Sequence, residues 1–238
     1  MSNIVIPDGG NIGSASDPDA ISIASSGKPT FSQGIANTGT IDAGTLGSSV
    51  VVPASVGSST VLIKTITASN GDTEILFQHN SNGVVLDSTY TIYMLLLSGI
   101  VPTTNGKNVY MQVGSSGGYD TGCRGGYHNW YDNGSSTGGA SGSLNSSYFW
   151  NSQGNALYGG KQNGGLAGIF MLHNLSDAAY ATHATFSTIF FGSNAYYYGM
   201  TGSTTTVNEY TVDRIKFLTD SDSFQGGSKI SLYGIKDA

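Results

Sequence analysis

The sequence predicts an all-β fold: an antiparallel, jelly-roll-like β-sandwich with an extended N-terminal arm. The first observation is composition, because Gly, Ser, Thr, Asn and Tyr dominate while strong helix formers such as Glu are scarce. The second is spacing, since apolar, β-prone segments recur about every ten residues from residue 50 onward, as in sandwiches and barrels. The third is turn chemistry: Asn-Gly pairs at 70–71, 82–83 and 105–106 are hairpin signals.

Residues 1–50 are predicted to form an N-terminal attachment or trimerisation arm. Their short apolar segments are separated by Gly, Asp, Ser and Pro, and none is long enough to build a core. A weakly apolar, β-prone region of this kind must dock on another surface or remain disordered. The apolar residues that we expect to make the attachment are Ile4, Ile6, Ile21, Ile23, Phe31 and Ile35.

Residues 51–238 are predicted to form the sandwich knob. Its most apolar segment, 90–98 (YTIYMLLLS), has almost no polar alternation, which predicts a central strand covered on both faces. The segment 109–113 follows an Asn-Gly pair and is expected to be its hairpin partner. One helical turn is expected at 176–181, with Ser176 as its N-cap. The other predicted strands are 50–52, 61–67, 73–78, 84–86, 166–172, 185–191, 212–218 and 229–235.

Residues 114–165 differ from the rest of the knob, because Gly, Ser and Asn alternate there with aromatic residues. A flexible linker would lack the aromatics, and a core segment would carry Leu, Ile and Val. Glycine permits tight turns and aromatic rings give rigid contact area, so we predict ordered surface loops, with short strands near 127–131 and 148–150. An equally weighted alternative is that the rings pack beneath the loops themselves. The candidate ligand-binding residues are Tyr119, Tyr127, Trp130, Tyr131, Tyr148, Trp150 and Tyr158.

Charge and cysteine usage exclude some functions and favour a compartment. The net charge of -6 and the isolated positions of the few cations argue against nucleic-acid binding. The single cysteine, Cys123, cannot form an internal disulfide, which fits folding in a reducing cytoplasm. Neither a signal peptide nor an apolar run long enough to span a bilayer is recognisable, so we expect synthesis in the cytoplasm and no membrane insertion.

Three patterns suggest catalysis, and two of them fail on sequence grounds. The segment 114–118 (GSSGG) matches the G-x-S-x-G pattern of hydrolases, but that motif needs a helix after the turn and an α/β sheet beneath it. The run GGKQNGG lacks the Walker pattern, because Gln162 follows Lys161 where Ser or Thr is required. Asp120 and Asp132 are the one carboxylate pair that could serve a retaining glycosidase, which needs a separation of about 5 Å.

Histidines and paired aspartates also give no convincing metal site. The four histidines lie in separate segments without Cys or Glu at zinc-ligand spacing, although His173 and His183 flank one loop and could approach each other. The aspartate pairs at 17/19 and 220/222 are more typical of turns than of calcium sites, which need about six to eight oxygens. We therefore predict no catalytic residue, no cofactor and no metal site.

Both ends of the chain carry a resemblance to known proteins. Residues 14–35 (SASDPDAISIASSGKPTFSQGI) resemble short repeats in fibre and appendage proteins of tailed bacteriophages, with an alternating AI-x-I segment, a Gly turn and a short Phe-containing strand. Residues 39–53 (GTIDAGTLGSSVVVP) continue in the same style. Residues 228–238 (SKISLYGIKDA) look like the LYGI-containing ending common among marine phage virion proteins.

The resemblance implies a structural protein on the virion surface, without enzymatic activity. Such proteins are commonly homotrimers, in which an N-terminal thread attaches to capsid or tail proteins and a C-terminal β-sandwich forms a knob. The low-charge, Gly-, Asn- and Tyr-rich exterior also suits contact with host-surface polysaccharide. Long tail fibres usually carry a large adaptor domain before the knob, whereas only residues 1–50 precede it here, so a capsid decoration (cement) protein that stabilises the head competes with the fibre. A polysaccharide depolymerase is the third alternative.

Overall fold

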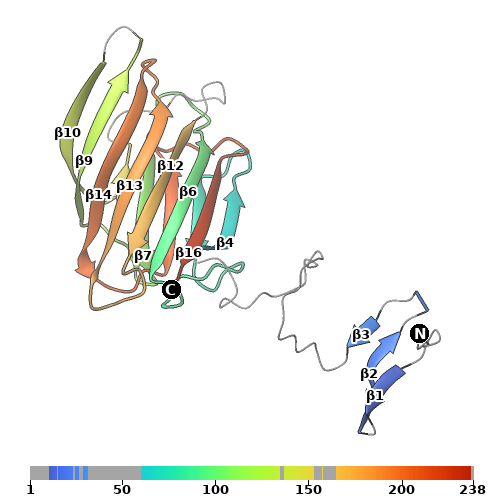
Figure 1. Cartoon of the computed structure of the whole chain (residues 1–238). Helices are drawn as coiled ribbons and strands as arrows, with labels where there is room; N and C mark the ends of the chain where they lie inside the picture. Colours follow the sequence, from blue (N-terminus) through green and yellow to red (C-terminus); the bar gives the residue numbers. More distant parts are fainter. Residues whose placement is uncertain are drawn as a thin grey trace. The chain divides into compact units, whose positions relative to one another are not determined.

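The computed structural model describes residues 11–14, 16–23, 25–26, 29–31, 60–134, 137–152, 157 and 165–236. Every regular element in these residues is a β-strand, which confirms the predicted all-β fold (Figure 1). The chain divides into two units, 1–51 and 52–238, which are described separately. The sequence analysis places its own boundary between residues 50 and 51.

The first unit contains a small antiparallel sheet in the order β1-β2-β3. Its strands are β1 (Asn11–Ser14), β2 (Asp17–Ile23) and β3 (Pro29–Phe31). Ile21 and Ile23 of β2 are half-buried, and Ile21 pairs with Phe31. The described part of the arm is thus folded into strands that pair with one another, where a purely extended arm was expected. Ile4, Ile6 and Ile35 lie outside the described residues, and the attachment role stays a prediction.

The second unit is built around an eight-stranded antiparallel sheet in the order β10-β9-β14-β13-β12-β6-β16-β4, which we call the large sheet (Figure 1). Its strands are β4 (Thr60–Thr67), β6 (Ile92–Ile100), β9 (Cys123–Asp132), β10 (Thr137–Ser146), β12 (Leu166–His173), β13 (Ala181–Phe191), β14 (Tyr197–Glu209) and β16 (Lys229–Ile235). The C-terminal LYGI segment lies in β16, between β6 and β4.

A smaller sheet, in the order β11-β7-β15-β5, covers one face of the large sheet. Its strands are β5 (Glu74–Gln78), β7 (Val109–Ser115), β11 (Trp150–Asn151) and β15 (Arg214–Thr219), and the short β8 (Gly118–Tyr119) pairs with β7. Rings from the two sheets meet between them: Phe170 of β12 lies 5.4 Å from Trp150 and 6.2 Å from Phe217 of β15, measured between ring centroids. This arrangement confirms the predicted β-sandwich, whereas the jelly-roll topology stays a prediction.

The Asn-Gly pairs form turns, but none of these turns makes a hairpin: no strand directly follows 82–83, and the turns at 70–71 and 105–106 join strands of different sheets. Gly71 and Gly106 have positive φ angles of 94° and 80°, as glycine in a tight turn allows. However, β4 and β6 belong to the large sheet while β5 and β7 belong to the small one, so each turn carries the chain across the sandwich. The predicted pairing of 109–113 with 90–98 is therefore wrong, because β7 pairs with β11, β15 and β8.

Two local predictions also differ from the structure, and a third cannot be compared with it. Residues 84–86 form no strand, although Val84 and Leu86 are buried, and the Leu86 N–H donates to His79 Nδ1 at 3.1 Å. Residues 176–181 form turns followed by the start of β13, and no helix. Residues 50–52 lie outside the described part of the chain.

Strand β6 is central, as predicted, but the described residues cover only its inner face. Tyr93, Leu95 and Leu97 point into the core and are at most 4% exposed. The alternate residues Ile92 and Met94 are half-buried on the outer face, and Leu96 is 36% exposed there. The absence of polar alternation in 90–98 thus reflects an outer face that is apolar and open.

Candidate functional site

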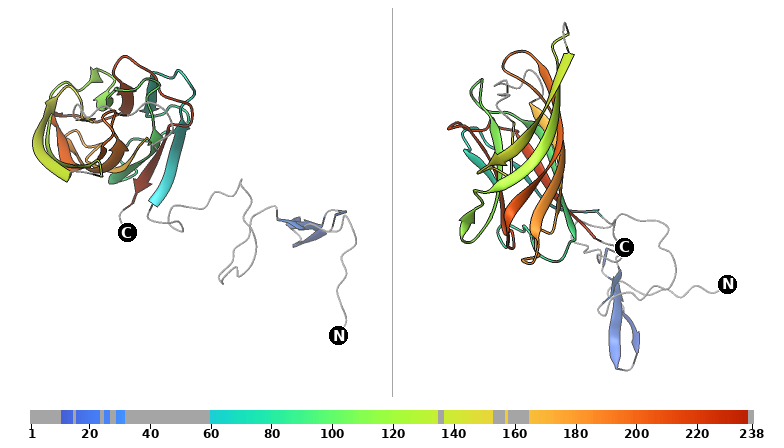
Figure 2. Two further views of the ribbon diagram at one scale, coloured as in Figure 1. Left: turned by 90° about the horizontal axis from the view of Figure 1, so that it is seen from above. Right: turned by 90° about the vertical axis from the view of Figure 1, so that its left-hand side faces the viewer.

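In its described residues the Gly-aromatic stretch is mostly strand, where loops over 114–165 were predicted. Strands β9 and β10 form a hairpin with ten paired positions, from Asp132 opposite Thr137 to Cys123 opposite Ser146. The hairpin adds two strands to the edge of the large sheet beyond β14, and Figure 2 shows it in yellow-green. The strands expected near 127–131 and 148–150 are confirmed as parts of β9 and β11.

Three of the candidate ligand-binding rings lie on the small-sheet side of the molecule. Trp150 is completely buried in the core, where it also contacts Phe186, so its assignment to a recognition surface is corrected. Tyr148 stacks on Tyr110 at 4.1 Å between centroids. The Nζ of Lys216 lies 3.9 Å from the centroid of the Tyr119 ring, a cation–π contact. Tyr158, a fourth candidate, lies outside the described residues.

Tyr127 and Tyr131 point inward from β9 and pack against the core. Each ring covers a glycine of β10: a Cβ at Gly142 or Gly138 would lie 2.4 Å from the hydroxyl oxygen of Tyr127 or Tyr131, respectively. Tyr131 also meets Tyr196 edge-on at 5.4 Å. These two tyrosines explain why β10 is rich in glycine, and they serve packing, as the alternative in the sequence analysis held.

Trp130 is the candidate that the structure leaves on the surface. It points outward from β9, is 44% exposed, and lies over Gly199 of β14, where a Cβ would approach the indole to 2.1 Å. The indole ring therefore packs directly on the backbone of β14. Ile189 on β13, opposite Gly199, and Tyr197 at the start of β14 are 47% and 51% exposed. We call Trp130, Ile189 and Tyr197 the Trp130 platform.

The sequence analysis missed Ile189 and Tyr197. Ile189 belongs to an alternating segment, Thr185 to Phe191, in which the register alone decides which set of side chains is buried. Tyr197 meets Phe191 edge-on at 4.8 Å and pairs with Asp132 of β9. The end of β9 and the start of β14 are thus brought together by cross-strand pairing, for which the sequence carries no local signal.

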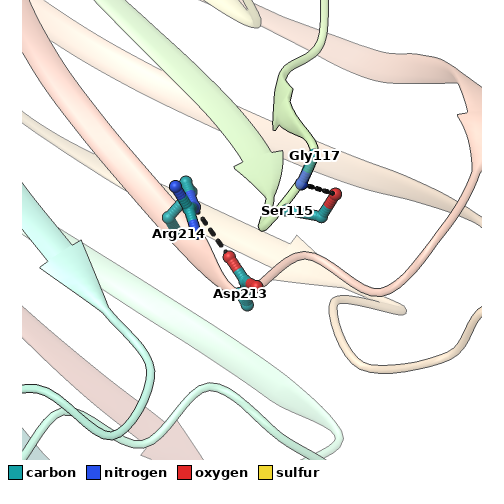
Figure 3. A network of polar contacts seen from close by, with 4 residues as sticks. All are labelled: Ser115, Gly117, Asp213 and Arg214. Atoms are coloured by element: carbon teal, nitrogen blue, oxygen red, sulfur yellow. Dashed lines mark hydrogen bonds and ion pairs between the residues drawn. The ribbon is translucent and has the colours of Figure 1, made fainter.

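The G-x-S-x-G segment forms a two-residue turn between β7 and β8 rather than a nucleophile elbow. Gly114 pairs with Tyr119 and Ser115 with Gly118, so strands lie on both sides of the turn. The Gly117 N–H donates to Ser115 Oγ at 3.4 Å, and the neighbouring polar contact is the Asp213–Arg214 ion pair at 2.8 Å (Figure 3). The α/β environment that the motif requires is absent from the described residues.

Asp120 and Asp132 do not form a glycosidase pair. Asp120 is 8% exposed and accepts hydrogen bonds from the Gly122 N–H at 2.8 Å and the Tyr210 hydroxyl at 3.2 Å. Burial, and then the nearby Asp120 charge, raise the pKa of Tyr210. Asp132 caps a turn by accepting from the Gly134 N–H at 2.6 Å. The ten residues of β9 separate the two carboxylates by about 30 Å, which is far beyond the required distance.

Histidines meet in one place on the large sheet. His173 of β12 lies directly opposite His183 of β13, so the expected approach of these two residues is confirmed. Among the described residues, no group of three His, Cys, Asp or Glu side chains is placed to hold a metal ion. In the same part of the chain, no helix has the length and apolar character to cross a membrane.

A scan against protein-family models finds no match to this chain, and a search of curated proteins finds none either.

Proposed function

We propose that this protein is a non-enzymatic structural protein on the surface of a tailed-bacteriophage virion. It forms a homotrimeric fibre or knob, attached to other virion proteins through its first unit. The observation that carries the proposal is an apolar surface on the outer side of the large sheet, away from the small sheet. The argument for self-association starts from this surface.

The apolar surface spans four neighbouring strands. In one cross-strand row, Leu62 of β4, Tyr233 of β16, Met94 of β6 and Met171 of β12 are successive register partners. Leu62 is 53% exposed, and the other three are half-buried. With the adjoining rows the apolar face comprises Leu62, Ile92, Met94, Leu96, Ile169, Met171, Tyr233 and Ile235.

A second copy of the chain is the partner that suits this apolar face. The face contains no charged side chain, so its partner must also offer uncharged, apolar surface. The same face on further copies meets that requirement, because three such faces can pack around a common axis in a closed cyclic assembly. A three-fold arrangement also unites three copies of the first unit, as the resemblance to phage fibres implies.

The two segments that resemble phage proteins have defined structural roles, which supports the proposal. The AI-x-I segment forms part of β2, and the LYGI segment forms the last four residues of β16. Gly234 of LYGI lies beneath the Tyr90 ring, because a Cβ there would be 2.3 Å from Tyr90 Cγ. The alternation of β4, β5, β6 and β7 between the two sheets favours the jelly-roll topology expected for such a knob.

The Trp130 platform is the proposed contact with host-surface polysaccharide. A rigid indole that lies flat on a sheet presents an apolar face on which the C–H groups of a sugar ring can stack. The neighbouring exposed Tyr197 adds a hydroxyl for hydrogen bonding. The remaining predicted residues, Tyr119, Tyr127, Tyr131 and Tyr148, support this surface from within or lie elsewhere.

Light scattering after size-exclusion chromatography tests the self-association. The full-length protein is expected to have the mass of three chains, and Leu96→Asp is expected to be a folded monomer because it places a charge at the centre of the interface. Val207→Asp is the matched control, since Val207 is 46% exposed on β14 and outside the apolar face. A monomeric wild-type protein, or a Leu96→Asp variant that remains trimeric, contradicts the proposal.

A capsid decoration protein is the alternative within the same class. It would use the first unit to bind capsomers and the apolar face to form its own oligomer. Electron microscopy of assembled particles separates the two: copies arranged with capsid symmetry on the head indicate decoration, and copies at the tail indicate a fibre. A depolymerase would instead release reducing sugar ends from host polysaccharide, which a reducing-end assay with purified protein detects.

A further inference from the structure

A second feature lies on the outer side of the large sheet, next to the apolar face: a shallow groove over β9, β14, β13 and β12. One cross-strand row contains Arg124, Thr205, His183 and His173, each paired in register with the next. Strands lie about 4.8 Å apart, so the row from Arg124 to His173 is about 14 Å long. Three side chains that can donate N–H groups to an anion are thus aligned along one line.

The groove arises because the next cross-strand row has short side chains. Ser203 and Thr185 are short, and Gly126 beside them has no side chain. The resulting hollow has a volume of about 300 Å³, with Arg124, His173, His183, Thr185, Ser203 and Thr205 among its lining residues. Apart from the three N–H donors, its lining side chains are mainly hydroxyl groups. Such a lining can donate and accept hydrogen bonds along a chain of sugar hydroxyls.

The three N–H-donating side chains of the groove have no partner among the described residues. Among the described residues, the Arg124 guanidinium has neither a hydrogen bond nor an ion pair, and the Thr204 hydroxyl donates to the Arg124 backbone oxygen at 3.3 Å. Within the described part of the chain, the imidazoles of His173 and His183 likewise have no hydrogen-bond partner. By contrast, Arg214 and Lys216 on the small sheet pair with Asp213 and Glu74.

The local charge also differs from that of the whole molecule. The chain has a net charge of -6 and only nine Lys and Arg residues in all. No carboxylate occurs among the described residues that line the groove. An arginine without a carboxylate partner, on an otherwise acidic protein, leaves an electropositive position for a bound anion. A single arginine is too little for a nucleic-acid backbone, which requires extended clusters of Lys and Arg.

We infer that this groove binds an acidic polysaccharide, with the Arg124 guanidinium contacting a carboxylate or sulfate group and the imidazoles of His183 and His173 supporting it. Arg124 and Trp130 lie six residues apart on the same face of β9, which places them about 20 Å apart along the strand. One glycan chain that follows β9 can therefore reach both the groove and the Trp130 platform. The inference rests on the proposed glycan contact and adds that the bound glycan is negatively charged.

Isothermal titration calorimetry with the full-length protein tests this inference. The probes are three oligosaccharides of equal length: a galacturonate, a sulfated galactan and a neutral galactan. We expect at least one acidic probe to bind about tenfold more tightly than the neutral one, and Arg124→Gln to remove that tenfold preference, which corresponds to one lost charge-assisted contact. Comparison of galacturonate with sulfated galactan identifies which anion is preferred.

Two further variants make the outcome specific. Lys229→Gln removes the same charge from β16 of the same sheet and is expected to leave the affinity unchanged. If it weakens binding as much as Arg124→Gln, non-specific attraction explains the result and the inference fails. Trp130→Ala is expected to weaken neutral and acidic probes alike. If all three probes bind with equal affinity and only Trp130→Ala weakens them, the groove does not select acidic polysaccharide, but the proposed glycan contact stands. If no probe binds, both the inference and the proposed glycan contact are wrong.

Discussion

The two tryptophans of the Gly-aromatic stretch (114–165) should respond oppositely to the same substitution. Trp150 is fully buried, and a tryptophan that removes about 250 Å² from water contributes about 6 kcal/mol as an upper bound at about 25 cal/mol per Å². Measured losses for such core substitutions are about 3–5 kcal/mol. Trp130 is 44% exposed, so just over half of its area is buried, and we expect Trp130→Ala to cost about 2 kcal/mol.

Urea unfolding followed by far-UV circular dichroism measures this difference. With an m value of about 2 kcal/mol per molar urea, the midpoint of Trp150→Ala should lie about 1 M below that of Trp130→Ala. Both variants are compared at equal protein concentrations, because self-association also raises apparent stability. Trp150→Phe is the control: it keeps a ring against Phe170 and Phe186 and removes an indole N–H that has no partner among the described residues, so its loss should be small. A midpoint for Trp130→Ala at or below that of Trp150→Ala would refute the assignment of the two rings to surface and core.

Two further predictions follow from titrating groups. Burial alone would raise the pKa of Asp220, but hydrogen bonds from the Tyr110 hydroxyl at 2.5 Å and from Asn108 at 2.8 Å outweigh it and lower the pKa. The stabilisation from the ionised Asp220 is therefore complete above the ordinary aspartate pKa of about 3.9, and it is lost as the pH falls through the lower pKa of the folded protein. The free energy of unfolding should therefore fall below about pH 4, and it should fall less in Asp220→Asn. Burial, followed by the charge of Asp120, raises the pKa of the Cys123 thiol to about 12. A thiol reagent at pH 8 should therefore label Cys123 only when urea unfolds the protein. Rapid labelling without urea would contradict the burial of Cys123.

Much of the sandwich could be predicted because strand signals are local. The run Lys229 to Ile235 alternates every second residue and forms β16 over those same bounds. The run Ile92 to Leu97 is apolar at every position, and its central place in the sheet followed from that. In both cases, the side chains of a single segment are enough to predict the strand and its burial.

Other features depend on pairing between distant segments, for which a single sequence carries little signal. The turn residues at 70–71 do not encode whether the next strand pairs with the previous one or crosses to the other sheet. Trp130 and Trp150 have similar neighbours in sequence, and only the register places one over Gly199 and the other against Phe170. The glycines of β10 resemble a loop until Tyr127 and Tyr131 are seen to cover two of them. Propensity thus failed where cross-strand packing decides the structure.

The position of β16 between β6 and β4 has a consequence for folding. Its Lys229 pairs with Thr67 of β4, a separation of 229 − 67 = 162 residues along the chain. At a synthesis rate of about 5–20 residues per second, β4 waits roughly 8–32 s for β16, its neighbour in the sheet. Until then, β6 can pair with β12 along one edge, and its other edge has no hydrogen-bonded neighbour because β16 has not been made. Such long-range closure is slow and prone to aggregation, so the yield of folded knob in the cell should depend on chaperones that shield β4 and β6 until the final strand is made.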